Sequence, residues 1–470
     1  MDRVPPPGSR RTFALAAVVC GVLASGALLF ADGRQALQNA AALVRQGRLD
    51  EAVKQAQLAL ADPDARAAAY SVLGSIRLQQ QQLGDSARLF EEALRIEPGL
   101  PGAQINLAQV YVLQGKADRA LDVLRRALTA DPSLAPAAAS TWAGVAGVPA
   151  AASVKFALLL IDRGAVAEAI GILERVQATS PPSYEVSVNL GSAYVLNKEP
   201  ARALDAYDAA LAVAPEALPA LRQAAAIAEQ QGQLERALSY WIRAKRIASD
   251  DPDVLLGFGR VCWMMDLLDD AEPALEKAAQ LRPDGLAHQY TLAAVKVGKK
   301  QFDAAQRLLE PLVVAHPQDA RLQYALGAVL YTQGHLDDAV AHLRESARLD
   351  PAPPASQYYL ALATRDRGEE AEATAMLERL VQAHPDHAGA REALGGLQTG
   401  AQRYAEAEAN LRESIRLSPK SVKANYQLGL LLVRSGKREE GDRQLAFAKT
   451  LREEDAATSR LQLRLLDGGK

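Results

Sequence analysis

Apolar positions along the chain fall into two helical patterns that recur every 34 residues. In residues 101–134 a first apolar pattern runs up to Gly115, and a second then follows at the spacing of an amphipathic helix. The apolar positions are Ile105, Leu107, Ala108, Val110, Tyr111 and Val112, then Ala120, Leu121, Leu124, Ala127 and Leu128. Asp131 precedes Pro132, and a residue before proline disfavours the α conformation, so the second helix ends there. Each unit is therefore predicted to be a helical hairpin.

The register of this unit is maintained over most of the chain. Nine units fill residues 150–455 without insertion or deletion, and three more fill residues 33–134. Across the nine, the eighth position is Gly or Ala, the twentieth is Ala in all but the last, and proline closes seven. The small residues let helix backbones approach closely. One hairpin cannot bury both of its faces, so stacked neighbours supply the core of an all-α solenoid.

Leu-Gly pairs stand near the start of several units, at Leu73-Gly74, Leu190-Gly191, Leu326-Gly327, Leu394-Gly395 and Leu428-Gly429. Together with the mid-unit Gly, the Ala and the closing Pro, this unit resembles the tetratricopeptide repeat, over about nine-tenths of the chain. The resemblance implies a right-handed superhelical solenoid of helix–turn–helix repeats, with units 1–3 at 33–134 and units 4–12 at 150–455. Residues 456–470 form a tail. Pro273 and Pro311 stand inside second helices, where they are expected to bend or break them.

The N-terminal leader is predicted to carry a targeting signal. Residues 12–31 contain no charge and are long enough to cross a bilayer as a helix. Arg3, Arg10 and Arg11 precede them, so residues 1–11 are predicted to be cytoplasmic. This predicts a transmembrane signal anchor in a bacterial inner membrane, with the repeats on the periplasmic side. The alternative is a signal cleaved near the small residues Ala24, Ser25 and Gly26, which would release a soluble exported protein.

Residues 135–149 separate the two blocks of repeats. They are rich in Ala, Gly and Pro and carry no charge, which favours a flexible linker between the blocks. The alternative is that Trp142 docks into a groove or a partner.

Composition and motifs indicate no catalytic chemistry. The net charge is −3, and no basic stripe suggests nucleic-acid binding. Among the six histidines, the closest to ligand spacing is His342 with Glu345, and no third ligand converges on them. The histidines are therefore expected in solvated turns and on helix faces. We expect no metal, cofactor, small-molecule substrate or enzymatic activity.

The resemblance implies that the first helices line an inner groove, into which the second and fifth positions point. The fifth position reads Tyr290, Tyr324, Tyr358, Glu392 and Tyr426 over units 8–12, and Trp263 and Tyr331 occupy the twelfth. The predicted partner-binding residues are Tyr290, Tyr324, Tyr358, Tyr331, Trp263 and Tyr426. Tyrosine suits peptide recognition, but a purely structural ladder is also typical of the family. A carboxylate clamp of Lys155, Asn189 and Arg222 would lack polar neighbours, because Val154, Leu158 and Pro219 stand nearby.

These features predict a membrane-tethered scaffold of the bacterial cell envelope that binds partner peptides or domains in its groove. Assembly, secretion and polysaccharide export are candidate roles. The alternative is a non-catalytic, substrate-binding subunit of an enzyme or transferase complex. A soluble cytoplasmic adaptor conflicts with the apolar leader.

Overall fold

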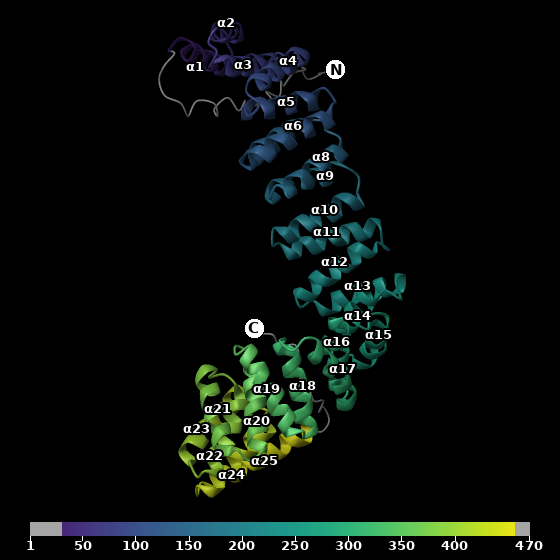
Figure 1. The fold of residues 1–470 in the computed structure, drawn as a ribbon, viewed down its shortest axis with the longest axis vertical. Coiled ribbons are helices and arrows are strands. Elements are labelled where there is room, and N and C mark those ends of the chain that lie inside the picture. The colour runs from purple at the N-terminus through teal and green to yellow at the C-terminus, as the bar shows by residue number, and fades with distance from the viewer. Residues whose placement is uncertain (1–30, 456–470) are drawn as a thin grey trace, which may run out of the picture. The chain divides into compact units, whose positions relative to one another are not determined.

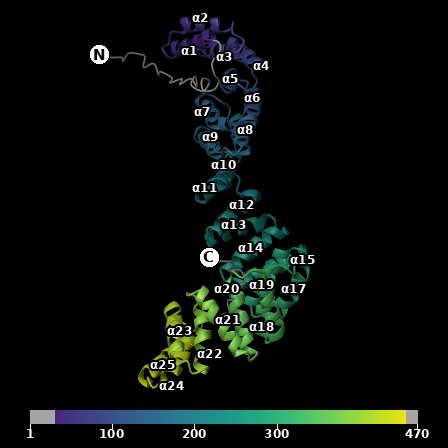
Figure 2. The same ribbon diagram turned by 60° about the vertical axis from the view of Figure 1, so that its left-hand side comes forward.

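The computed structural model describes residues 31–455, and within them every regular element is helical. The chain divides into two compact units, of which the first ends at Ile227 and the second begins at Ala228. Within each unit, most successive helices lie side by side in chain order (Figure 1, Figure 2). The all-α, solenoid-like fold is thus confirmed, whereas the right-handed superhelix stays a prediction.

The first unit contains eleven complete α-helices. They are α1 (Ala31–Arg45), α2 (Leu49–Ala59), α3 (Arg66–Gln79), α4 (Leu83–Ile96), α5 (Pro101–Leu113), α6 (Ala117–Ala130), α7 (Ala135–Gly144), α8 (Ala150–Asp162), α9 (Val166–Thr179), α10 (Tyr184–Leu196) and α11 (Pro200–Val213). A short 3-10 helix, η1 (Pro132–Leu134), precedes α7, and α12 (Leu218–Gln230) spans the division between the units.

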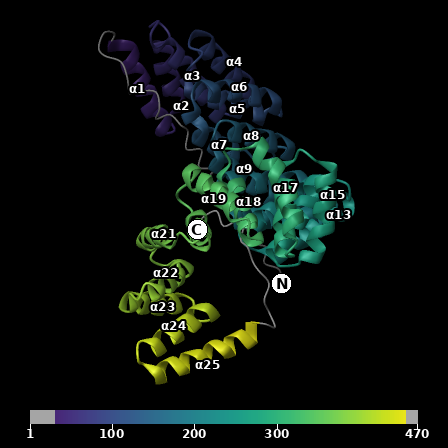
Figure 3. The ribbon, with the colours of Figure 1, turned by 60° about the horizontal axis from the view of Figure 1, so that its bottom comes forward.

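The second unit continues the pattern of paired helices (Figure 3). Its helices are α13 (Leu234–Ile247), α14 (Pro252–Met264), α15 (Leu268–Leu281), α16 (Leu286–Gly298), α17 (Phe302–Ala315), α18 (Ala320–Gln333), α19 (Leu336–Leu349), α20 (Pro354–Asp366), α21 (Glu370–Ala383), α22 (Ala388–Gly400), α23 (Tyr404–Leu417), α24 (Val422–Arg434) and α25 (Arg438–Asp455).

The small eighth residue of a 34-residue repeat lies against a large residue of the same repeat's second helix. A Cβ added at Gly327 would come within 2.7 Å of Leu343 Cγ, and one added at Gly191 within 2.9 Å of Tyr207 Cε2. Leu343 is fully buried and Tyr207 is 2% exposed. Close approach of the two helices therefore requires the small residue, as the sequence pattern predicted.

The turn inside each hairpin has one fixed backbone conformation. The residue at the fifteenth position of the repeat has a positive φ in all twelve repeats. These residues are Gly47, Gln81, Gly115, Gly164, Lys198, Gly232, Asp266, Lys300, Gly334, Gly368, Gln402 and Gly436. Glycine adopts this conformation without steric cost. Five repeats have another residue there, for which a positive φ is sterically unfavourable. The packing of the hairpin therefore imposes the turn even where glycine is missing.

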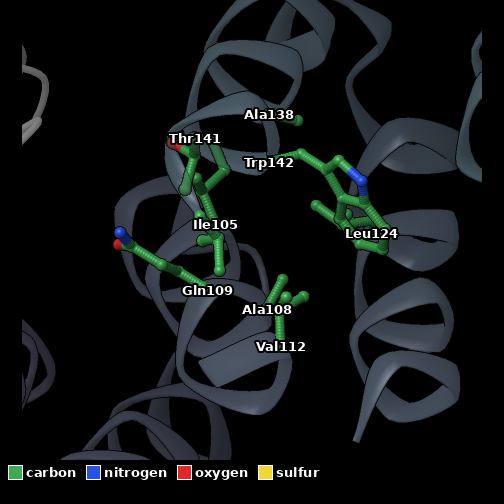
Figure 4. A pocket seen from close by; sticks show the side chains of 9 residues that line it. Ile105, Ala108, Gln109, Val112, Leu124, Ala138, Thr141 and Trp142 are labelled. Carbon is green, nitrogen blue, oxygen red and sulfur yellow. The ribbon is translucent and has the colours of Figure 1, made fainter. Parts of the chain in front are cut away.

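The predicted flexible linker is wrong for residues 135–144, because they form α7. Trp142 is 4% exposed, and its Nε1 donates a hydrogen bond to Ser153 Oγ at 3.1 Å. Its ring lies 4.6 Å from that of Phe156. Figure 4 shows Trp142 beside Leu124, facing a small apolar cavity that α5 also lines. An extra helix thus packs against α5 and α9.

The breaks expected at two prolines are absent, whereas the predicted membrane span lies outside the described residues. Pro273 and Pro311 lie inside α15 and α17, and both helices continue past them, so the expected breaks are absent. Among residues 31–455, no helix is long and apolar enough to cross a bilayer. The leader at 1–11, the predicted span at 12–31 up to residue 30, and the tail at 456–470 lie outside the described residues.

Candidate functional site

The six predicted binding residues all lie on first helices of the second unit. Trp263 is on α14, Tyr290 on α16, Tyr324 and Tyr331 on α18, Tyr358 on α20 and Tyr426 on α24. Their exposure differs widely, from 8% for Tyr290 to 51% for Tyr426. One position of the repeat therefore holds tyrosines in very different surroundings.

Tyr324, Tyr331 and Tyr358 come together around a residue that the sequence reasoning missed, Tyr359. The Tyr359 ring centroid lies 5.9 Å from that of Tyr324, 5.9 Å from that of Tyr331 and 5.5 Å from that of Tyr358. All three pairs meet edge to face, the arrangement that aromatic quadrupoles favour. We call these four partly exposed residues the tyrosine cluster.

A polar network borders the tyrosine cluster on α20. The hydroxyl of Tyr331 donates a hydrogen bond to Asp366 Oδ2 at 2.8 Å, and Arg365 Nε donates to Asp366 Oδ1 at 2.7 Å. Burial and the carboxylate together raise the pKa of Tyr331 to about 12, so its hydroxyl stays protonated at neutral pH. Burial alone would raise the pKa of Asp366, but the bonds from Arg365 and Tyr331 hold it below its ordinary value. Asp366 is therefore a carboxylate at neutral pH.

An open pocket lies between α18, the start of α19 and the end of α20. It is lined by Tyr331, Tyr359 and Asp366, together with Thr332, Gln333, Gly334 and Leu336. We call it the tyrosine pocket. Its walls combine two aromatic rings with a carboxylate and an amide, which suits a site for a side chain of another protein.

The other predicted residues do not join the tyrosine cluster. Tyr290 belongs to the hydrophobic core of the second unit, and burial raises its pKa to about 12. Trp263 packs against that same core while partly buried. At the fifth position of α22, Glu392 accepts a hydrogen bond from Ser421 Oγ at 3.1 Å and pairs with Lys423 at 2.8 Å. A buried carboxylate thus interrupts the row of tyrosines before Tyr426.

The remaining polar candidates are engaged elsewhere. Lys155, from the clamp that the sequence disfavoured, pairs with Asp118 at 3.2 Å. His342 Nδ1 lies 2.7 Å from Gln323 Oε1, and Glu345 pairs with Arg348 at 2.7 Å. Within residues 31–455 no group of three His, Cys, Asp or Glu side chains could hold a metal ion.

The expectation that the histidines are solvated is wrong for several of them. His288 is 4% exposed, and His387 Nδ1 accepts a hydrogen bond from the Ala390 amide at the start of α22. The centroids of the Tyr358 and His387 rings lie 4.8 Å apart, with the two rings tilted by 46°. These imidazoles are part of the packing between repeats.

Comparison with known families identifies the repeat. One model of the tetratricopeptide repeat matches residues 77–141, and a second matches residues 37–101, 154–221, 188–252, 290–354 and 358–422. The second alone covers more than half of the chain. No curated protein matches the chain in sequence.

Solved structures similar to the chain come from several organisms. Yeast Tom70 is 16% identical with a TM-score of 0.36, covering 90% of this chain and 96% of its own. A tetratricopeptide repeat protein from Parabacteroides merdae is 16% identical with a TM-score of 0.42, covering 52% and 97%. MamA from Desulfovibrio magneticus is 23% identical with a TM-score of 0.34, covering 36% and 96%.

Proposed function

Because the chain belongs to the tetratricopeptide repeat family, we propose that it is a protein-interaction scaffold whose tyrosine cluster binds a segment of a partner protein. The observation that carries the proposal is the convergence of four partly exposed tyrosines from α18 and α20 beside an open pocket. Tyrosine supplies a large apolar area at a low cost in conformational entropy, and its hydroxyl can accept or donate a hydrogen bond.

The contacts within the cluster support a binding role over a purely structural ladder. Tyr290, one repeat earlier, shows what a structural tyrosine looks like here, since its ring is almost fully buried. The rings of Tyr331 and Tyr359 instead line the pocket surface. Tyr331 is held in place by its bond to Asp366, so its side chain loses little freedom when a partner binds.

A photo-crosslinking experiment tests this proposal. A benzophenone amino acid is placed at Thr332, an exposed residue on the pocket rim, and in a matched control at Val314, which is 81% exposed on the second helix α17. The full-length chain is expressed in the cells that make it. We expect a protein adduct from position 332 but not from 314. Tyr331→Ala with Tyr359→Ala should weaken it, since each aromatic anchor contributes on the order of 1–2 kcal/mol. Equal adducts at the two positions would contradict the proposal.

We also propose that the scaffold is tethered to a bacterial inner membrane, with its repeats on the periplasmic side. The support is the charge-free stretch at 12–31 behind Arg3, Arg10 and Arg11. Tethering would confine the site to partners of the cell envelope, where assembly, secretion or polysaccharide export takes place. Protease treatment of spheroplasts should degrade the repeats while a cytoplasmic marker stays intact. Protection of both would contradict this orientation.

A further inference from the structure

The tyrosine pocket offers hydrogen-bond acceptors and aromatic faces, and none of its lining residues carries a positive charge. We propose that it binds a basic side chain, arginine or lysine, of the partner segment. This inference rests on the proposed function and names the residue type that the tyrosine cluster recognises.

Gln333 supplies the first acceptor. Its Nε2 donates a hydrogen bond to the Asp303 carboxylate at 2.8 Å, and this partner fixes the orientation of the amide, since a carboxylate can only accept. The other amide atom, Oε1, is buried and receives no hydrogen bond from the described residues. A buried carbonyl without a donor is unfavourable, so a ligand N–H group that reaches this oxygen by a small shift of the side chains covering it gains by pairing with it.

Asp366 supplies the second acceptor. Arg365 and Tyr331 each occupy one of its oxygens, and each carboxylate oxygen can accept a further hydrogen bond. Arg365 balances the charge of Asp366 but does not line the pocket. The surface that a ligand meets is therefore a carboxylate edge. An anionic side chain would be repelled by this edge, and an apolar one would leave Gln333 Oε1 unpaired.

The two tyrosine rings complete the match with a basic group. Tyr331 and Tyr359 are inclined to each other at 70°, with both rings on the pocket wall. A guanidinium or ammonium group within about 6 Å of a tyrosine ring is attracted by its electron-rich face. A planar guanidinium can also stack on one ring while its edge donates to carboxylate and amide oxygens. Arginine is thus the residue that uses every feature of the pocket.

Peptide binding to the full-length protein in mild detergent tests the inference. The probes are four sets of nonapeptides whose flanking positions are randomised in the same way. The sets differ only in the central residue, which is arginine, lysine, citrulline or glutamate. Citrulline matches the shape of arginine without its charge. We expect arginine-centred peptides to bind at least tenfold more tightly than citrulline-centred ones, with lysine in between.

Two pocket variants and one control assign the effect. Asp366→Asn should remove most of the preference for arginine, and Gln333→Met, which keeps every charge, should reduce it severalfold. Asp337→Asn makes the same charge change at a residue whose side chain is 89% exposed outside the pocket, and should leave the preference intact. Melting curves verify that each variant is folded. If Asp366→Asn does not fold, the result with Gln333→Met decides the test.

The outcomes separate this inference from the proposed function. Binding without preference among the four sets, or preference for glutamate, would overturn the basic-residue inference and leave partner binding at the cluster standing. A preference that survives both pocket variants would also overturn it. Failure of all four sets to bind, together with no adduct from position 332, would overturn both.

Discussion

The two units use tyrosine in different ways on their first helices. In the first unit Tyr111 and Tyr194 occupy the eleventh position of their repeats, and each donates its hydroxyl backwards, to Glu91 at 2.6 Å and to Glu174 at 2.7 Å. Each acceptor lies twenty residues earlier, on the preceding second helix. In the second unit Tyr331 occupies the twelfth position and donates forwards, to Asp366 at the end of the next first helix.

A shift of one residue explains this difference. One step along an α-helix turns the side chain by about 100°, enough to move it from the preceding second helix to the next first helix. A lysine at the eleventh position can make the same kind of bond, because Lys296 in the second unit bonds to Glu276, again twenty residues earlier, at 2.6 Å. In these three repeats the eleventh-position side chain therefore bonds to the preceding second helix, whereas Tyr331, at the twelfth position, lines the open pocket between α18 and α20.

The largest expected effect concerns a structural tyrosine of the first unit. Tyr207 on α11 is 2% exposed and packs on Gly191 of α10. Tyr207→Ala should lower the free energy of unfolding by about 3–5 kcal/mol, because it leaves a cavity where the helices cannot collapse. Urea unfolding followed by circular dichroism measures it. Tyr331→Ala serves as the control from the cluster and should cost clearly less stability. Equal losses would erase the distinction between the units.

The second expected effect is an acid sensitivity confined to the second unit, which contains all six histidines. Burial lowers the pKa of His288, His342 and His387. The unfolded chain, whose histidines titrate near 6.5, then binds more protons than the folded chain. The contribution of these histidines to the free energy of unfolding is therefore fully present above about pH 6.5, and it is lost as the pH falls below that value. Asp253 on α14 faces His288 at 3.6 Å and opposes the effect, while Arg282 strengthens it.

Amide hydrogen exchange at pH 7.5 and 5.5, corrected for intrinsic rates, measures this sensitivity by region. Protection should fall in the second unit and hold in the first. His387→Asn is a matched variant, since asparagine can still accept the bond from the Ala390 amide but does not titrate. It should reduce the loss around α22. An equal loss of protection in both units would contradict the assignment to histidine.

The sequence predicted the fold well because the repeat averages over local irregularities. The 34-residue period predicted the positions of the hairpins even in the five repeats whose central turn lacks glycine. The prediction from sequence failed at α7, where a segment rich in Ala, Gly and Pro suggested a flexible linker. Alanine is also the strongest helix former, and Trp142 supplies a buried anchor that composition does not reveal.

The candidate site was less predictable, because burial depends on neighbours that the repeat pattern does not specify. The fifth position grouped Tyr290 with Tyr324 and Tyr358, yet Tyr290 belongs to the core. Tyr359 was missed because its sixth position was not among those expected to face the groove. The Tyr358-Tyr359 pair in the sequence was the available signal, since adjacent aromatic residues let one ring bridge to its neighbours.

A smaller effect is expected from the eleventh-position bond itself. Tyr194→Phe removes the hydroxyl that donates to Glu174, which keeps Arg202 as a partner. The loss should therefore be only about 1 kcal/mol of unfolding free energy, with the crosslink from position 332 unchanged. Tyr331→Phe makes the same chemical change at the twelfth position and should weaken that crosslink. A weaker crosslink with Tyr194→Phe would contradict the separation of roles.

The smallest expected effect concerns Tyr426, the most exposed of the predicted binding residues at 51%. Glu392 and its bonds to Ser421 and Lys423 stand between it and the tyrosine cluster in the row of fifth positions. Tyr426→Ala should change the free energy of unfolding by less than about 0.5 kcal/mol, as is usual for an exposed side chain. The crosslink from position 332 should also stay the same if the partner segment ends at α20. Tyr358→Ala, at the equivalent position inside the cluster, should lower both the crosslink and the stability. A crosslink that falls as far with Tyr426→Ala as with Tyr358→Ala would show that the partner continues along α22 and α24, because an exposed ring two repeats away affects binding only by touching the partner.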